Sequence, residues 1–423
     1  MLFLAVIAFA LIAQLWLLGR QRRHVLAHRH RIPSPFEGFL SLKDHQKAAD
    51  YTLARARLAR IELLFSTFLL LLWTLGGGLN ALHDLIPSGA GRVLGVLVLT
   101  SLLELPFSLY RTFFLEQRFG FNHSTPALFF KDTLKEMGLL VLFGLPLAGA
   151  MLWLMEHGGQ AWWLYAWGLW MAFALLLTWA YPRYLAPLFN TFTPLDDAPL
   201  RRRIQGLLER NGFSSQGIDV MDGSLRSSHG NAYFTGLGRQ KRIVFYDTLL
   251  KDLTHEEIEA VLAHELGHFK GRHVLKGLIL MAMVSLGALA LFAWLSQKAW
   301  FYGALGVEHP SPPMALALFL LLLPTLNAYL QPLLASFSRR HEFEADDFAA
   351  SQTSPSHLIS ALAKLYRENA HTLTPDPLYS AYHDSHPAAP ARVANLKAKE
   401  VTHENPAPHP SPAAVPCPGP RGG

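Results

Sequence analysis

Two histidines and a glutamate carry the clearest chemical signal in this 423-residue chain. The run Val261-Leu-Ala-His264-Glu265-Leu-Gly-His268 places the histidines four residues apart. On a helix, side chains at i and i+4 lie on one face, so His264 and His268 can bind one metal ion together. Glu265 then lies beside the metal, where it can accept a proton from the attacking water. The spacing predicts a catalytic zinc site with one Zn²⁺ per chain. The alternative is a solvated helix with two incidental histidines, because the chain contains 20 histidines.

A third ligand must come from elsewhere, because catalytic zinc usually has three protein ligands. Glu342 is the best candidate, and it shares a helix face with Asp346 four residues later. Glu344 and Asp347 point elsewhere. A solvated acidic face is the alternative, but this run is rich in phenylalanine and alanine. We expect Glu342 to bind zinc, and Asp346 either to orient a ligand histidine or to assist proton transfer.

The composition predicts that these residues are positioned by a membrane protein. Hydrophobic residues make up 51% of the chain and charged residues 16%. Seven apolar runs approach the roughly 20 residues needed to cross a hydrocarbon core of ~30 Å. They cover residues 1–19, 61–82, 93–111, 138–155, 161–180, 274–295 and 314–335. The first run lacks a cationic start, so we interpret it as a retained anchor and not as a cleaved signal peptide.

The distribution of positive charge predicts the orientation in the membrane. Loops after the first, third, fifth and seventh runs are rich in lysine and arginine. By contrast, the loop after the second run holds only Arg92, and the loop after the sixth holds only Lys298. The loop after the fourth run holds no lysine or arginine. The N-terminus is therefore expected outside and the metal motif on the cytoplasmic side. The net charge of +6 then follows from topology and from attraction to lipid headgroups, and it requires no nucleic-acid partner.

The remaining sequence predicts a small α/β catalytic part. We expect a helix at about 200–211, strands near 217–221, 231–235 and 242–246, and a helix at about 390–399. Thr254 and Glu257 form a capping-box pattern at the start of the motif helix. The chain divides into a five-span membrane region (1–181), a catalytic segment (182–273), two further spans (274–335), a second catalytic segment (336–402) and a disordered tail (403–423). The single cysteine, Cys417, excludes disulfides and cysteine-based metal sites.

The ordered motifs resemble the type 1 CAAX prenyl proteases, integral-membrane zinc metallopeptidases of the gluzincin kind. The resemblance rests on His264-Glu-Leu-Gly-His268 and, after two further spans, on Glu342-Phe-Glu-Ala-Asp346. Residues 116–122, 187–195, 228–234, 242–249 and 385–387 add to it, so it covers about residues 1–400. It implies seven transmembrane helices that form a barrel around an intramembrane chamber, with a small zincin-like catalytic domain. It also implies cleavage near the C-terminus of a substrate, after an isoprenylated cysteine.

Several further residues gain candidate roles. The strand-like run Asn231-Ala232-Tyr233 could pair, as an edge strand, with an extended peptide substrate; an internal strand is the alternative. The resemblance implies that His386 lies over the metal and stabilises the oxyanion. It offers His229 and Arg392 as weaker substrate-binding candidates. We interpret His255, His273 and His383 as bystanders.

Glu104, in the third span, should face the helix bundle or water, because a lipid-facing carboxylate is costly. Two rival functions stay open: a membrane quality-control protease for misfolded or unprenylated proteins, and a seven-span transporter or receptor with an incidental histidine pair. Heavy use of alanine, leucine, arginine and proline indicates a GC-rich bacterial genome, so we expect the bacterial inner membrane.

Overall fold

The computed structural model describes residues 2–235 and 240–404, and these are mostly helical. Six helices are long and apolar enough to cross a membrane, and α2 with α3, bent by 56°, makes a seventh. The longer helices are α1 (Leu2–His28), α2 (Leu42–Trp73), α3 (Gly78–Leu85), α4 (Gly89–Tyr110), α6 (Pro126–His157), α7 (Trp162–Ala180), α12 (His273–Leu295) and α14 (Pro312–Gln352). The seven predicted spans correspond to these helices.

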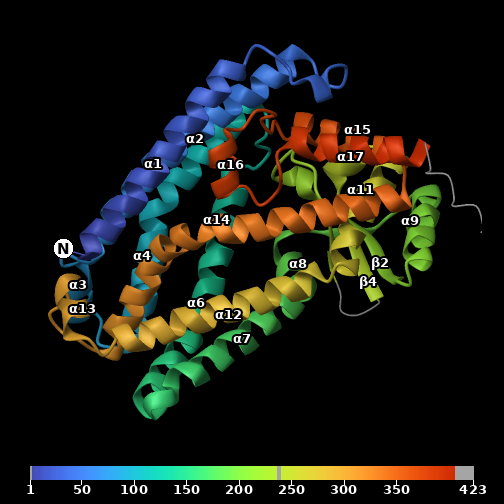
Figure 1. Ribbon diagram of the computed structural model, residues 1–423. Helices are drawn as coiled ribbons and strands as arrows, with labels where there is room; N and C mark the ends of the chain where they lie inside the picture. The colour runs from blue at the N-terminus through green and yellow to red at the C-terminus, as the bar shows by residue number, and fades with distance from the viewer. Residues whose placement is uncertain (1, 236–239, 405–423) are drawn as a thin grey trace, which may run out of the picture.

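The membrane helices are packed together at one end of the molecule and diverge toward the other. Figure 1 shows the start of α1 beside α3 and α13, with α1 and α12 running from there to opposite sides. A buried cluster that includes Leu79, Phe292 and Ala315 holds this end together. Short segments link the membrane helices to one another and to the catalytic part: η1 (Ser34–Phe36), the π-helical turn η2 (Arg111–Glu116), α5 (Gln117–Phe119), η3 (Gly159–Ala161), the π-helical turn η4 (Tyr181–Leu185), α8 (Ala186–Phe189) and α13 (Ala299–Ala304).

The catalytic part contains a four-stranded sheet in the order β1-β2-β4-β3. Its strands are β1 (Phe192–Pro194), β2 (Ser214–Met221), β3 (Ala232–Thr235) and β4 (Gln240–Tyr246). β2 and β4 are parallel, whereas β1 and β3 each pair antiparallel with their neighbour. The three predicted strands are confirmed, and β3 lies at an edge. β1 was not predicted, because three residues that include a proline give no alternating pattern.

Further helices complete the catalytic part and pack on the sheet, on one another or on α14. They are α9 (Ala198–Arg210), η5 (Gly223–Leu225), α10 (Asp247–Asp252), α11 (His255–Lys270), α15 (Pro355–Glu368), α16 (Pro377–His383) and α17 (Ala389–Glu404). Ile243 and Phe245 of β4 are buried in one core with Leu262 and Leu266 of α11. Burial of this apolar side of α11 leaves its histidines on the side that faces α14. The segment from residue 405, part of the predicted tail, lies outside the described residues.

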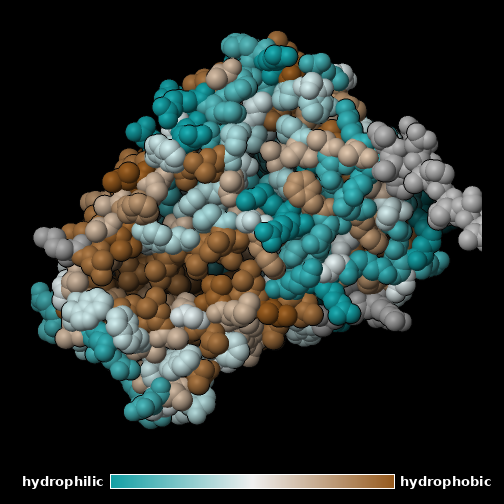
Figure 2. Space-filling view, viewed as in Figure 1, coloured by the Kyte–Doolittle hydropathy of each residue, from teal (hydrophilic) through white to brown (hydrophobic). Residues whose placement is uncertain are grey.

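Helix α14 joins the two parts of the molecule. It continues for 41 residues from the last span into the catalytic part, as Figure 1 shows. The predicted division between residues 335 and 336 therefore falls inside a helix. The loss of continuous hydrophobicity after residue 335 marks where α14 leaves its apolar surroundings and not where it ends. Figure 2 shows the matching change at the surface, from apolar side chains over the membrane helices to polar ones over the catalytic part.

Candidate active site

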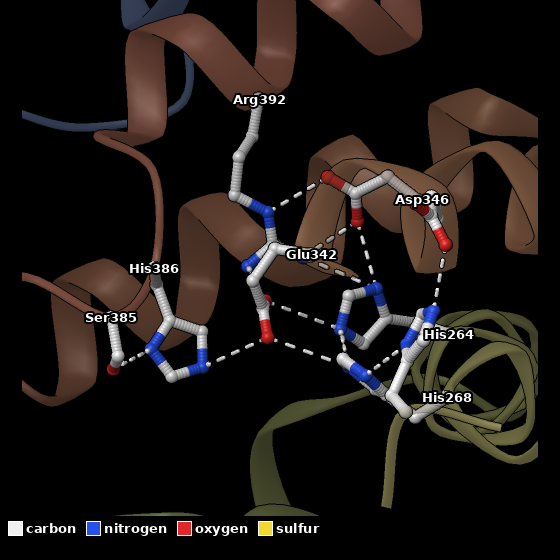
Figure 3. A network of polar contacts seen from close by, with 9 residues as sticks. His264, His268, Glu342, Asp346, Ser385, His386 and Arg392 are labelled. Carbon is white, nitrogen blue, oxygen red and sulfur yellow. Dashed lines mark hydrogen bonds and ion pairs between the residues drawn. The ribbon is translucent and has the colours of Figure 1, made fainter. Parts of the chain in front are cut away.

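His264, His268 and Glu342 come together at the crossing of α11 and α14. One ligand atom from each lies within 4.8 Å of the others, a distance at which one metal ion could bind all three. The two Nε2 atoms are 3.3 Å apart. Glu342 Oε2 is 3.5 Å from His264 Nε2, and its Oε1 is 3.4 Å from His268 Nε2. Figure 3 shows the three side chains converging. We call them the metal triad.

Local features of α11 and α14 bring the triad together. The predicted capping box is confirmed: Thr254 N donates to Glu257 Oε2 at 2.7 Å, and Glu257 N donates to Thr254 Oγ1 at 3.3 Å. Gly267 permits close contact between the helices, since a Cβ there would lie 2.9 Å from Ala345 Cα. A larger residue at position 267 would therefore push Glu342 away from the histidines.

The other ring nitrogen of His264, Nδ1, which points away from the triad, is held in a buried environment. Its Nδ1 lies 2.8 Å from Asp346 Oδ1, and the Asp346 side chain is fully buried. Arg392 donates to both oxygens of Asp346, from Nη2 at 2.6 Å and from Nε at 2.9 Å. Burial lowers the pKa of His264, but its hydrogen bonds with Asp346 and Glu342 raise it to about 9. Of the two roles predicted for Asp346, these contacts favour orienting the ligand histidine.

His268 has a different support, which the sequence analysis did not identify. Its Nδ1 lies 3.0 Å from Nδ1 of His273, and Nε2 of His273 lies 2.8 Å from Glu344 Oε2. His273, which we interpreted as a bystander, therefore contacts a triad histidine, and Glu344, which points away from the triad as expected, contacts His273. A histidine five residues after the motif was the available signal, but the turn at Gly271 and Arg272 separates it from α11, so helical periodicity does not relate the two. His255 instead contacts Asp197.

His386 lies close to the triad and is exposed, whereas Glu265, the residue after His264, is half-buried. The His386 side chain is 62% exposed, its Nε2 is 3.4 Å from Glu342 Oε1, and its Nδ1 is 3.1 Å from Ser385 Oγ. Glu265 makes no hydrogen bond or ion pair with any residue in the described ranges, and it lines a cavity. Both side chains line this cavity, where a peptide could reach them.

That cavity has a volume of about 1830 Å³ and extends from the triad to the membrane helices. It exceeds the roughly 300–1,000 Å³ typical of small-molecule sites, so it has room for a peptide. Residues of α2, α4 and α6 form its far wall, among them Glu62, Glu104 and Glu136. Glu104 was expected to face the bundle or water, and this is confirmed.

The predicted substrate-binding residues are distributed unevenly around the cavity. His229, Asn231, Ala232 and Arg392 line it, whereas Tyr233 is not among its described lining residues. Side chains alternate along a strand, so Tyr233 points to the face opposite Ala232. Arg392 is only 6% exposed and is engaged by Asp346, with its Nη1 3.7 Å from Glu342 Oε2.

His229 connects the start of β3 to the membrane helices. Its Nε2 lies 3.7 Å from Glu116 Oε2, and its Nδ1 lies 3.1 Å from Asn369 Oδ1. Tyr51 of α2 donates to the other oxygen of Glu116 at 2.6 Å. Gly230 N also donates to Asn369 Oδ1. The segment that leads into β3 is thus fixed by side chains from both parts of the molecule.

Comparison with known proteins identifies two adjoining families in the chain. Residues 21–191 match a family described as CAAX prenyl protease N-terminal, five membrane helices, and residues 194–400 match peptidase family M48. CAAX prenyl protease 1 homologues are similar over nearly their whole length. The one from Oryza sativa subsp. japonica is 33% identical, covering 91% of this chain and 94% of that protein. The one from Mus musculus is 32% identical, covering 94% and 95%.

A solved structure shares the fold. The crystal structure of S. mikatae Ste24p matches with a TM-score of 0.86 and 30% sequence identity, covering 93% of this chain and 98% of that one. The likeness therefore includes the membrane helices as well as the catalytic part.

Proposed function

This chain belongs to the CAAX prenyl protease 1 family of M48 metallopeptidases, and we propose that it binds one Zn²⁺ and cleaves peptides after a prenylated cysteine near their C-terminus. It is an integral, multi-pass membrane protein and a metalloprotease. The zinc ion, the prenylated substrate, the orientation and the residue roles given below are parts of the proposal.

The convergence of the metal triad is the observation that carries the proposal. Two imidazole nitrogens and a carboxylate are the donor set of many catalytic zinc sites. Glu342 Oε2 is buried, and its contacts with His264 Nε2 at 3.5 Å and Arg392 Nη1 at 3.7 Å are long, which suits a metal ligand. We therefore assign His264, His268 and Glu342 as the ligands. A bound zinc ion would supply Lewis acidity that polarises the scissile carbonyl and activates water.

The other residues of the site supply proton transfer and positioning. Glu265, free of partners in the described chain, would accept the proton of the attacking water and pass it to the leaving amine. His386 would donate a hydrogen bond to the developing oxyanion. Asp346 would hold His264 through its Nδ1. We assign Arg392 to positioning as well, since its guanidinium is engaged by Asp346 and not free for substrate.

We propose that the peptide lies along the edge of β3. Among the described residues, β3 pairs with β4 alone, and its first residue, Ala232, lines the cavity together with the preceding Asn231. An extended peptide could add to this edge through main-chain hydrogen bonds. Tyr233 would then contribute its backbone and not its side chain.

The orientation is proposed from the arrangement of the ends. Figure 1 places the N-terminus beside α3 and α13, at the end remote from the sheet. An outside N-terminus therefore puts the metal triad at the cytoplasmic end, in agreement with the basic loops. The composition supports the bacterial inner membrane.

A peptide-cleavage assay tests this function. Purified protein in detergent is incubated with a farnesylated CAAX peptide and with the same peptide unmodified, while bound zinc is measured by elemental analysis. We expect about one zinc per chain, cleavage after the modified cysteine, and loss of cleavage with a chelator. Equal cleavage of both peptides would support the quality-control alternative, and no zinc with no cleavage would contradict the proposal.

Replacing Glu265 with Gln separates chemistry from metal binding. Because Glu265 is proposed to move protons and not to bind zinc, Glu265→Gln should lower kcat by at least about 100-fold. Its zinc content should stay at the level of the unmodified protein. The matched variant Glu342→Ala should lose both, and zinc retention in that variant would remove Glu342 from the ligand set.

A further inference from the structure

The turn that joins α11 to α12 has an unusual backbone. Arg272 adopts φ +54° and ψ +33°, in the left-handed region that residues with a Cβ rarely adopt. Gly271, just before it, has no space for a side chain, because a Cβ there would overlap the His273 ring, 2.7 Å from its Cε1. The turn therefore brings the His273 ring back over the end of α11.

His273 is the first residue of a membrane helix, yet its ring is buried at the metal triad. One face stacks on His341 of α14, with ring centroids 4.0 Å apart and planes at 9°. Its Nδ1 is 3.0 Å from Nδ1 of His268, and its Nε2 is 2.8 Å from Oε2 of Glu344. Both nitrogens of His273 thus have partners, one a triad histidine and the other a carboxylate.

The hydrogen positions in this chain of contacts follow if a metal ion binds Nε2 of His268. His268 directs Nε2 toward Glu342 and His264, so a metal ion would take Nε2 and leave the proton on Nδ1. Nδ1 of His268 then donates to Nδ1 of His273. His273 must therefore carry its own proton on Nε2, from which it donates to Glu344.

We propose that His273 is a positioning residue for the metal ligand His268, and that it connects the ligand to the charge of Glu344. The inference rests on the proposed zinc function. A carboxylate commonly accepts the second N–H of a metal-bound histidine, fixing its tautomer and raising its basicity. Here an imidazole stands between the two. His273 also begins α12, so the same contact ties a membrane span to the metal triad.

Zinc affinity, measured by competition with a chromophoric chelator at fixed pH, tests the proposal. His273→Phe keeps the ring and its stacking on His341 but removes both nitrogens. It should weaken zinc binding about 10- to 100-fold. His273→Gln can accept through its carbonyl and donate through its amide, so it should restore affinity to within about fivefold. A ring that merely fills space predicts the reverse order, with Phe better tolerated than Gln.

Three further variants complete the test. Glu344→Gln should weaken zinc binding in the unmodified protein but cause no further loss in His273→Phe, because it acts through that ring. Gly271→Ala should reproduce the loss by displacing the ring, and it decides the question if His273→Phe does not fold. His341→Phe, which keeps the stacking, should bind zinc normally.

The outcomes separate this inference from the function beneath it. Unchanged zinc affinity in folded His273→Phe, or independent losses from His273→Phe and Glu344→Gln, would overturn the positioning role while leaving the zinc site intact. If the unmodified protein binds no zinc, or if His268→Ala binds it equally well, the proposed function itself fails.

Discussion

The two histidines of the metal triad differ in what holds their outward nitrogens. Nδ1 of His264 meets the carboxylate of Asp346 directly at 2.8 Å, whereas Nδ1 of His268 meets the imidazole of His273 at 3.0 Å. The carboxylate on the first side is fully buried and that on the second, Glu344, is 54% exposed. We call the buried support of His264, formed by Asp346 and Arg392, the dry side of the site. The more exposed support of His268, formed by His273 and Glu344, is the wet side.

This difference shows how each support should respond to change. On the dry side, Asp346 and Arg392 are a buried ion pair, and removing one charge leaves the other without its main partner in a buried place. On the wet side, water can replace a lost partner of Glu344, so the cost is smaller. We expect variants on the dry side to affect folding as well as metal binding, and variants on the wet side to affect mainly metal binding.

Asp346→Asn should have the largest effect. The buried charge of Arg392 would lose its two hydrogen bonds to a carboxylate and keep only Glu342 Oε2 at 3.7 Å, which costs up to about 3–5 kcal/mol of unfolding free energy. Zinc affinity should fall about 10- to 100-fold. Thermal unfolding with a chelator present measures the first effect without the contribution of bound metal.

Asp347→Asn is the matched control on the same helix. Asp347 pairs with Lys399 at 3.0 Å, and both side chains are more than 40% exposed. Its loss should cost no more than about 1 kcal/mol. Equal effects of the two variants would show that the buried pair stabilises the fold no more than an exposed one.

The double variant Asp346→Asn with Arg392→Met should be less damaging to stability than the sum of its single changes. Each single change leaves a buried charge without its partner, whereas the double change leaves none from this pair. The coupling between the positions should be at least about 1 kcal/mol, measured as a double-mutant cycle of unfolding free energies. Additive losses would show that the pair is not the unit that stabilises this side.

Most residues of the dry side could be predicted from the sequence, whereas those of the wet side could not. His264, His268, Glu342 and Asp346 lie on helices, where a fixed spacing determines which side chains share a face. His273 and Glu344 meet only because of the turn at Arg272. No sequence pattern predicted the left-handed conformation of this residue. The order and number of membrane spans followed from hydrophobic length, since a bilayer imposes it.

Other parts of the structure depend on packing that a sequence does not specify. The continuity of α14 through residue 335 could not be predicted from a polarity change, because a helix can leave an apolar environment without ending. The burial of Arg392 against Asp346 joins residues 46 positions apart. The partners of such long-range pairs emerge only when α17 packs on α14.

On the wet side, Lys276→Met should have a small effect. Lys276 Nζ lies 3.5 Å from Glu344 Oε2, and both side chains are about half exposed. An exposed pair contributes about 0–1 kcal/mol, so zinc affinity should change by at most about fivefold. The same titration at low and high salt should show this change shrinking as salt screens the charges. A loss as large as that of His273→Phe would place Lys276 in the support of His268.

A change at the start of α11 should not distinguish the two sides, because this helix carries both histidines. Burial raises the pKa of Glu257, but hydrogen bonds from Lys364, Ser360 and the backbone of Thr254 lower it below its usual range. This carboxylate therefore stabilises the fold above its unfolded pKa of about 4.3, and the contribution is lost as pH falls through the folded pKa.

Glu257→Gln should cost about 1 kcal/mol at pH 7. The difference should shrink below pH ~4, where the unmodified protein becomes protonated as well. Unfolding of the metal-free protein across this pH range measures it, with Glu256→Gln as the exposed control. A Glu257→Gln variant that weakened zinc binding through only one histidine would show that the helix start does not hold both ligands as one unit.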